Sequence, residues 1–478
     1  MTPLRIGFVA VVRPAFKGDG AAVARRSLSA LATVAGEQRA DLHADDAAGH
    51  GAAIVRDAVE AAAIGRRLET EGLDLLFVLH ATFATGDLLA PLLAAAPRVV
   101  VWAVPEAAGA RVGGPDGVRG PLPLNSLCGL NMTLSFAEGP RGGARGRVGW
   151  CYGDPDDPAL RSRLRTLIAA ERGARALATT RVLAIGGTAP GFYGLELPGL
   201  PGGATVIERP LADLFARVEA VDEEAAVAHA EAWRAEEPLD APWAHLVRAA
   251  RIELALVALA RDADANALAV RCWPELPDAC GAMACAAMGR AADRWLPAAC
   301  EGDVWGATSM RVLQAVAATP AALLDLSDLD RGRDALLLWH CGNAPRTMAA
   351  APGTRLTTHF NRDGLGVVRD QTLAPGPATA FRLLPADPAR GPALGAVVIG
   401  GRVLEAEGPS FDGVRGWWGE LTWSREPVSA ERAVAGILDH RLPHHLALAP
   451  GDARTALLEL CERLGATPLP PSPRGGLG

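Results

Sequence analysis

Apolar runs and amphipathic stretches alternate along the first part of the chain. The apolar runs have the length of buried strands, and the stretches between them repeat apolar residues at helical spacing. Strand-length runs cover residues 5–12, 73–79, 98–104 and 147–152, and helical stretches cover 21–35, 55–71, 86–95, 126–137 and 158–177. Apolar strands separated by amphipathic helices predict a parallel sheet that is covered on both faces.

A second alternation begins at residue 181, and the pattern changes after Asp325. The later runs are short, apolar or alternating, and they are separated by Gly, Pro and Asp, which predicts antiparallel β structure in a barrel or sandwich. The second alternation has strands at 181–185 and 267–273 and helices at 223–236, 243–261 and 277–291. The later strands are expected at 335–340, 355–358, 364–368, 379–384, 395–404 and 419–423, and helices at 427–442 and 453–464. A loop rich in Gly and Pro is expected at 106–124, and a frayed tail at 468–478.

Length and composition limit the classes of protein to consider. The 478 residues are too many for one core and predict about three domains. The net charge of −7 argues against nucleic acid or an anionic membrane as the main partner. None of the 8 cysteines forms a CxxC pair, and neither a signal peptide nor an apolar run of membrane-spanning length is evident. A cytoplasmic protein is therefore expected.

Two carboxylates stand out between residues 298 and 326. Glu301 follows an apolar run and precedes a predicted helix, whereas Asp325 directly follows the buried run 322–324. Carboxylates at the ends of buried segments are costly unless they are paired, hydrogen-bonded or bound to a cation. Brought to one side of a sheet, the two would suit a divalent metal with oxygen ligands. The alternative is that Glu301 caps a helix and Asp325 starts a turn.

Other polar residues leave strands at positions where ligands bind in open α/β sheets. Glu275 and His340 follow such strands, although a helix-capping carboxylate and a hydrogen-bonded histidine are equally ordinary roles for them. The pair His444 and His445 lies between a helix and an apolar run and can present one imidazole to a metal. The loop 186–191 fits neither a dinucleotide-binding nor a P-loop pattern. No GxSxG motif is present, and lysine is scarce.

Together, these segments resemble the L-fucose isomerase and L-arabinose isomerase family, in particular its fucose isomerase-like branch. The resemblance covers nearly the whole chain and follows the same order. Its segments are 6–16, 76–83, 101–106, 125–129, 184–193, 272–276 (CWPEL), 299–303 (ACEGD), 338–345 (LWHCGNAP) and the histidine pair. The fold that it implies has two Rossmann-like parallel-sheet α/β domains, 1–178 and 179–322, followed by a C-terminal antiparallel β-barrel domain, 323–478.

The resemblance also implies a metal site and an activity. It places the metal ligands at Glu301, Asp325 and His445, with His444 as the fallback if the pair is shifted by one. Glu301 and Asp325 would also be the catalytic acid and base in aldose–ketose isomerisation through a cis-enediolate. Mn²⁺ or another divalent cation would bridge two sugar oxygens, and oxygen-rich coordination with open water positions favours Mn²⁺ over Zn²⁺.

Substrate contacts and assembly are likewise implied by the resemblance. Sugar hydroxyls would be bound by the substrate-binding set Arg13, Trp102, Asn125, Glu275, His340 and His444. A homotrimer or homohexamer is expected, in which Arg13 and Trp102 can act on a neighbouring subunit's site.

Three substrates or roles remain open at this point. The first is a fucose- or arabinose-like sugar, and the second is a modified sugar such as a sulfonated or 6-deoxy hexose. The third is a non-catalytic sugar-binding or regulatory protein with the same fold. The shorter C-terminal domain, compared with long fucose isomerases, puts the identity of the sugar in question.

Overall fold

A computed structural model describes residues 2–44, 53–107, 122–144, 146–362, 364–387, 393–406, 411–474 and 476–477. Most of the loop expected at 106–124 lies outside these residues. The chain divides into two compact units, Met1–Arg172 and Gly173–Gly478. Within the described part of the chain, no helix has both the length and the apolar character needed to cross a membrane.

The first unit is a parallel sheet between two layers of helices. Strands follow the order β2-β1-β4-β5-β6, β3 also pairs with β1, and every pairing is parallel. The strands are β1 Arg5–Val11, β2 Asp41–Ala44, β3 Ala53–Val55, β4 Leu75–His80, β5 Val99–Ala103 and β6 Val148–Tyr152. The helices are α1 Gly20–Glu37, α2 Ala58–Thr70, α3 Gly86–Ala94, α5 Ser126–Glu138 and α6 Pro158–Ala178.

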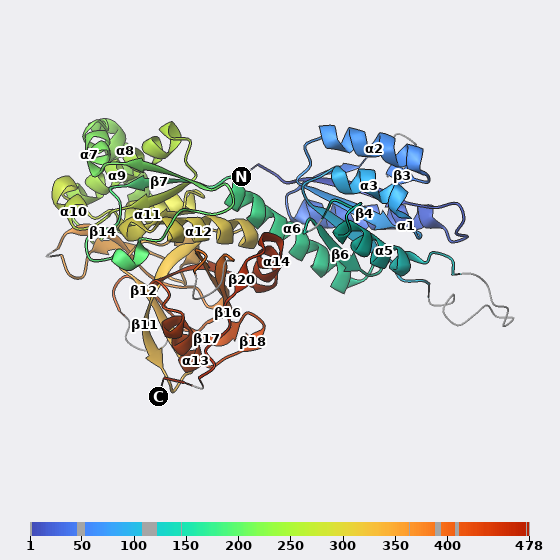
Figure 1. Ribbon diagram of the computed structural model, residues 1–478. Helices are drawn as coiled ribbons and strands as arrows, with labels where there is room; N and C mark the ends of the chain where they lie inside the picture. The colour runs from blue at the N-terminus through green and yellow to red at the C-terminus, as the bar shows by residue number, and fades with distance from the viewer. Residues whose placement is uncertain are drawn as a thin grey trace. The chain divides into compact units, whose positions relative to one another are not determined.

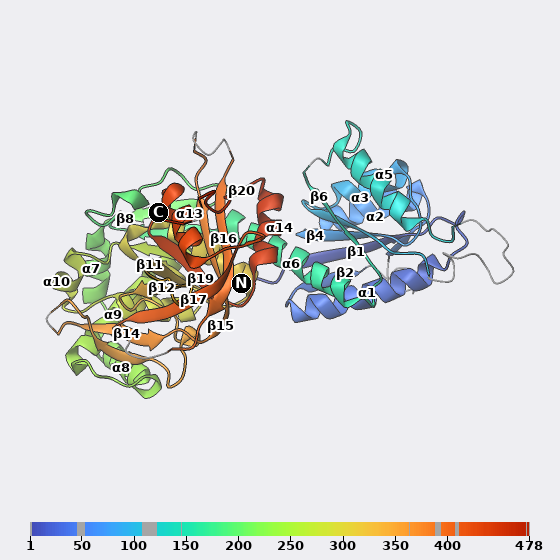
Figure 2. The same cartoon turned by 90° about the horizontal axis from the view of Figure 1, so that it is seen from below.

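Period-two alternation along these strands supplies both apolar faces of the sheet. On β1, Phe8 and Ala10 pack with α1 and α6, whereas Val9 and Val11 pack with α2 and α3 on the opposite face. Figure 2 shows α1 and α6 on one side of the strands and α2, α3 and α5 on the other. This arrangement confirms the predicted parallel sheet covered on both faces.

A second parallel sheet opens the second unit. Its strand order is β10-β9-β7-β8, formed by β7 Arg181–Ile185, β8 Thr205–Arg209, β9 Ala267–Val270 and β10 Ala298–Ala299. Helices α7 Leu211–Glu219, α8 Glu223–Glu236, α9 Trp243–Asp262, α10 Glu275–Cys280 and α11 Cys285–Asp293 accompany it. Their apolar side chains share one core with those of β7 and β9.

The remaining strands form one large mixed sheet. Ten strands follow, namely β11 Ala322–Asp330, β12 Ala335–His340, β13 Arg355–Thr358, β14 Gly366–Thr372, β15 Gly376–Leu384, β16 Gly395–Val403, β17 Val414–Trp423, β18 Glu426–Pro427, β19 His445–Pro450 and β20 Thr467–Pro468. Most pairings are antiparallel, but β14–β17 and β16–β20 are parallel. The prediction of a β-rich C-terminal region is confirmed, whereas the prediction of a purely antiparallel sheet was wrong, because these two pairings are parallel. Helices α13 Ala430–Asp439 and α14 Arg454–Leu464 accompany it.

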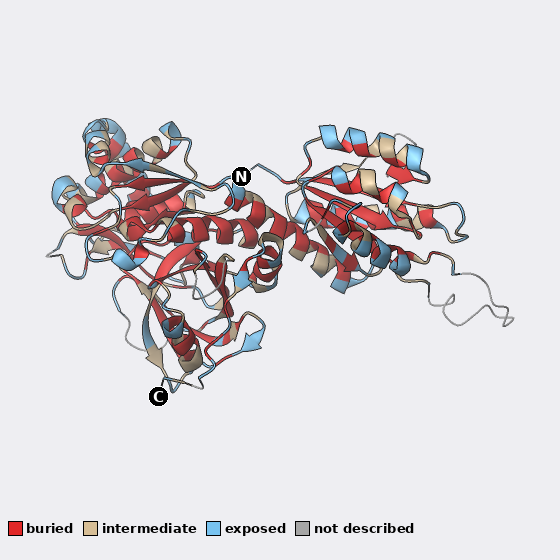
Figure 3. Ribbon diagram, in the orientation of Figure 1, coloured by how far each residue is buried: buried red, intermediate tan, exposed pale blue. Residues whose placement is uncertain are grey.

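Helix α12, Val304–Ala317, lies between the two sheets of the second unit. It packs against β9 of the parallel sheet and against β15 and β19 of the large sheet. In Figure 1 it lies between β7 of the parallel sheet and β11 and β12 of the large sheet. Figure 3 shows the helix buried along its length, and its buried residues are mostly small or apolar, with Arg311 and Gln314 among the polar ones. Its N-terminus therefore lies where both sheets can contribute side chains.

Several predicted element boundaries were wrong. Residue 55 belongs to β3, so the helix predicted at 55–71 begins only at Ala58. The helix predicted at 277–291 is two helices, α10 and α11. The tail is packed rather than frayed where it is described, because Ser472 is fully buried and the indole N–H of Trp423 donates to the Leu469 carbonyl. Such tertiary contacts leave no local pattern in the sequence.

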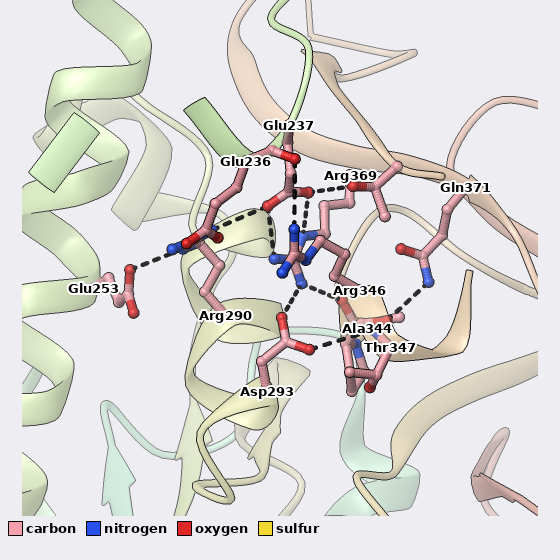
Figure 4. A network of polar contacts seen from close by, with 12 residues as sticks. Glu236, Glu237, Glu253, Arg290, Asp293, Ala344, Arg346, Thr347, Arg369 and Gln371 are labelled. Carbon is pink, nitrogen blue, oxygen red and sulfur yellow. Dashed lines mark hydrogen bonds and ion pairs between the residues drawn. The ribbon is translucent and has the colours of Figure 1, made fainter. Parts of the chain in front are cut away.

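A buried network of charges joins β14 to the helices of the second unit (Figure 4). Arg369 and Glu237 are both fully buried and form two hydrogen bonds of 2.8 and 2.9 Å. Arg369 also pairs with Asp293, and Arg290 bridges Glu237 and Glu253. Burial raises the pKa of Glu237, but the charge and hydrogen bonds of Arg369 outweigh it, so the pKa lies below its ordinary value.

We expect Glu237→Gln to destabilise the second unit by about 3–5 kcal/mol, because it removes the buried carboxylate that Arg369 and Arg290 share and leaves Arg369 with the partly exposed Asp293 as its remaining charged partner among the described residues. A carboxylate with a depressed pKa contributes stability above its ordinary pKa of 4.5 that is lost as the pH falls through the folded-state value. The loss of stability on acidification should therefore be smaller in this variant. Urea denaturation at several pH values measures both effects.

The control is Glu420→Gln, which breaks the exposed pair with Arg402 in the same sheet region. Exposed pairs contribute about 0–1 kcal/mol, so this variant should behave like the wild type. Equal effects of the two substitutions would contradict the assigned role of the Glu237–Arg369 pair.

Candidate metal centre

The strand register brings Asp325 and His445 to the same face of the large sheet. β11 lies between β12 and β19, and Asp325 is directly opposite His445 on β19 and Trp339 on β12. Residues directly opposite each other in antiparallel strands project to one face with their Cβ atoms close together. Two residues 120 positions apart in the sequence thus become neighbours through hydrogen bonding of the backbone alone.

Glu301 reaches the same place from a tight turn that follows β10. Its φ of 60° is in the left-handed region, and Gly302 follows with a φ of 77°. A Cβ atom on Gly302 would lie 2.1 Å from the Gly187 carbonyl oxygen, so only glycine fits there. The N–H of Ala189 donates to the Glu301 carbonyl at 2.9 Å. The turn holds a strained non-glycine backbone, as functional sites often do.

The side chains of the three predicted ligands meet at one nitrogen of His445. Nε2 of His445 lies 3.6 Å from an oxygen of Glu301 and 3.6 Å from Oδ1 of Asp325. Neither contact is a hydrogen bond at that distance. Both Nε2 of His445 and Oδ1 of Asp325 are buried and have no hydrogen-bond partner among the described residues. Buried polar atoms of this kind are costly unless another group binds them.

Asp303 and Arg382 form a fully buried ion pair behind His445. Two hydrogen bonds of 2.6 and 2.9 Å join them, and Oδ2 of Asp303 lies 3.0 Å from Nδ1 of His445. Burial raises the pKa of Asp303, but the Arg382 charge and the hydrogen bonds from His445 and Arg382 outweigh it and hold the pKa well below its ordinary value. Because the fully buried Arg382 guanidinium donates to both of its oxygens, Asp303 is an ionised carboxylate that only accepts hydrogen bonds.

His444 lies on the exposed side of the same centre. Its Nε2 is 3.0 Å from an oxygen of Glu301, and its ring contacts Phe192 at 5.7 Å between centroids. Burial lowers the pKa of His444, but the hydrogen bond with Glu301 and the nearby carboxylates outweigh it, so its pKa is raised. His340 lies on the inner side, with its ring 5.8 Å from that of His445.

The other four residues of the predicted substrate-binding set contact other groups. Glu275 starts α10 and pairs with Arg271, which lies just after β9. Arg13, Trp102 and Asn125 belong to the first unit. Trp102 is fully buried and its indole N–H donates to the Gly153 carbonyl, whereas Arg13 follows β1 and Asn125 precedes α5. The second unit thus brings together Glu301, Asp325, His340, His444 and His445.

Two residues of this centre, Asp303 and Arg382, were not predicted from the sequence. Asp303, not Glu301, caps α12, since its Oδ1 accepts from the Gly306 N–H at 2.7 Å. The sequence did contain a signal for this role, because an aspartate directly before a helical stretch is a preferred helix cap. Arg382 stands in the middle of an apolar strand, which by itself suggests a buried partner. The identity of that partner, 79 positions away, could not be inferred locally.

The donor set fits a divalent cation. Two overlapping groups, Glu301 with His444 and His445 and Asp325 with His340 and His445, each have ligand atoms within 4.8 Å of one another. Carboxylate and imidazole donors with a buried, unpartnered nitrogen and oxygen suit a first-row divalent ion. The residues present are therefore compatible with the predicted metal.

Comparison with curated proteins finds relatives that all have the same name, sulfoquinovose isomerase. A sulfoquinovose isomerase from Alkalicoccus urumqiensis is 32% identical over 324 residues, covering 65% of this chain and 69% of that protein. One from Priestia aryabhattai is 26% identical and covers 81% of this chain and 83% of that protein. One from Clostridium sp. (strain MSTE9) is 27% identical, covering 73% and 76%. No protein-family model matches the chain.

We expect Gly302→Ala to displace Glu301 and to destabilise the second unit by about 2 kcal/mol or more, because the new methyl group overlaps a backbone carbonyl at a left-handed position. Gly187→Ala is the matched control, since its φ is 72° and a Cβ there meets nothing within 4 Å. Urea denaturation and Mn²⁺ titration should show a larger loss for Gly302→Ala in both. Equal losses would mean that the overlap is relieved without moving Glu301.

Proposed function

The chain belongs to the family of the sulfoquinovose isomerases, and from this membership we propose that it interconverts the aldose and ketose forms of a sulfonated hexose. The relatives' names favour the sulfonated sugar over the fucose- or arabinose-like sugar that the sequence placed first. Both readings describe a sugar isomerase, so the expected class of reaction is unchanged.

The observation that carries the proposal is the convergence of Glu301, Asp325 and His445. Their side chains come from a turn and two strands, and they meet around a buried nitrogen that has no partner among the described residues. A structural core has little use for such an arrangement, since each unpaired group would cost about 1–3 kcal/mol. A site that holds a cation beside a sugar gives each of these groups a partner.

Glu301, Asp325 and His445 would hold the cation. When bound, a divalent cation polarises the sugar carbonyl and stabilises the negative charge that develops on the oxygens. The chain itself must then move a proton between two adjacent carbons. The carboxylates are the available bases, because Glu301 and Asp325 are partly exposed at the centre, with 17% and 27% of their side-chain surface accessible.

The surrounding residues orient these carboxylates. His444 donates to Glu301 when protonated, which holds one carboxylate oxygen and leaves the other free to accept a proton. The turn at Gly302 fixes where Glu301 leaves the backbone. Asp325 is held by pairing on both sides of β11. Precise placement of the base matters because proton transfer requires hydrogen-bond reach.

A sugar panel tests the proposed reaction. Protein supplied with Mn²⁺ should convert sulfoquinovose to the corresponding ketose, incorporate solvent deuterium next to the carbonyl, and turn over unsulfonated hexoses much more slowly. Chelation should abolish turnover, and Mn²⁺ should restore it. Binding of the sugar without ketose or deuterium incorporation would favour the non-catalytic alternative. Preference for fucose or arabinose would reject the sulfonated substrate.

We expect Glu301→Gln to lower kcat by roughly 10²–10⁴-fold, since the amide can neither accept the carbon-bound proton nor carry the ligand charge. Turnover of sulfoquinovose and the melting temperature are measured on the same preparation. The control is Glu426→Gln, an exposed glutamate on β18 that should leave both unchanged. Retained activity in Glu301→Gln with a normal melting temperature would remove Glu301 from the mechanism.

A further inference from the structure

Two buried histidines lie side by side at the centre, and they are not equivalent. His340 ends β12 and His445 begins β19, and their side chains are 3% and 0% exposed. Each has a ring nitrogen within 4.8 Å of an Asp325 oxygen, so distance alone allows either to ligate a cation. A neutral imidazole carries one hydrogen, and its hydrogen bonds determine which nitrogen keeps a lone pair.

The partner of His445 fixes its hydrogen on Nδ1. Nδ1 lies 3.0 Å from Asp303, whose carboxylate is held by two hydrogen bonds from the fully buried Arg382. An ionised carboxylate only accepts, so Nδ1 of His445 must donate. Nε2 then keeps its lone pair and faces the oxygens of Glu301 and Asp325. This is the tautomer that binds a metal through Nε2.

The partner of His340 places the hydrogen of that imidazole on Nε2. The backbone N–H of Cys341 donates to Nδ1 of His340 at 2.9 Å, and Sγ of Cys341 lies 3.3 Å from the same atom. A backbone amide is always a donor, so Nδ1 of His340 carries the lone pair and Nε2 carries the hydrogen. Nε2 of His340 is thus a hydrogen-bond donor and not a ligand.

We propose that the contacts at Nδ1 give these two histidines opposite roles, with the Asp303–Arg382 pair positioning His445 as the metal ligand and His340 donating its Nε2–H to an oxygen of the sugar. The inference rests on the proposed function, because it requires a cation and a sugar at this centre. It makes Asp303 and Arg382 positioning residues, which act through His445. It makes His340 a substrate-contacting donor.

Metal affinity separates the two histidines without using turnover. Mn²⁺ alone is titrated into the full chain and followed by electron paramagnetic resonance. Asp303→Asn should weaken Mn²⁺ binding about 10–100-fold, as loss of an outer-shell partner does. His340→Gln should change the Mn²⁺ affinity by no more than a factor of about 3, which is much less than the loss expected for Asp303→Asn. A large loss in His340→Gln, or none in Asp303→Asn, would overturn the assignment.

The control for destabilisation is Glu237→Gln, which breaks another fully buried arginine–carboxylate pair of the same unit. It should lower the melting temperature as Asp303→Asn does and leave Mn²⁺ affinity unchanged. If Glu237→Gln also loses the metal, the effect of Asp303→Asn is general loosening and the positioning role is rejected.

The wild-type protein provides a measurement that does not depend on a variant folding. Nitrogen chemical shifts of ¹⁵N-labelled histidine report which ring nitrogen carries the hydrogen. We expect Nδ1–H for His445 and Nε2–H for His340, with signals assigned from the His340→Gln spectrum. The same tautomer for both histidines would overturn the proposal.

Kinetics then test the contact between His340 and the sugar. His340→Leu, loaded with Mn²⁺, should lose roughly 10²-fold or more in kcat/KM, and His340→Gln should recover part of it because its amide donates. Equal activity of the two variants would reject the donor role. If the metal and tautomer results hold but wild-type protein isomerises no sugar, the proposed function fails and the assignment of the ligand stands.

Discussion

The ion pair between Asp303 and Arg382 is the contact on which the centre depends. It joins the N-terminus of α12 to β15, and Oδ2 of Asp303 also accepts a hydrogen bond from Nδ1 of His445 on β19. Both partners are fully buried, so each would carry a large desolvation cost without the other. Their mutual charge and the added hydrogen bonds offset that cost. One interaction therefore fixes a helix start, a strand and a histidine together.

The same region shows how the two sheets of the second unit share one site. The parallel sheet supplies Glu301 from the turn after β10, and the large sheet supplies Asp325 and His445 from adjacent strands. Helix α12 fills the space between the sheets, and its capping aspartate is also the partner of His445. The strained backbone at Glu301 is tolerated because the Gly187 carbonyl packs closely against Gly302 and holds the turn in this conformation.

The chemistry of an aldose–ketose isomerase is in keeping with this construction. The carbon-bound proton is weakly acidic, so the site must combine charge stabilisation with a well-placed base. The buried Nε2 of His445 would suit the first need as a cation ligand, and the partly exposed carboxylates of Glu301 and Asp325 would serve both needs. A second buried network, at Glu237 and Arg369, stabilises the same unit and is not part of this chemistry.

The sequence by itself determined the parallel sheets, the β-rich region after Asp325 and the acidic and histidine residues of interest. Those features follow from the period of hydrophobic residues and from residue type, and both can be recognised within a short stretch of sequence. Only the tertiary structure decided that Asp303 caps α12, that Arg382 is its partner, and that His340 and His445 present different nitrogens. Those decisions depend on strand register and on contacts between residues far apart in the chain, and a local pattern cannot encode them.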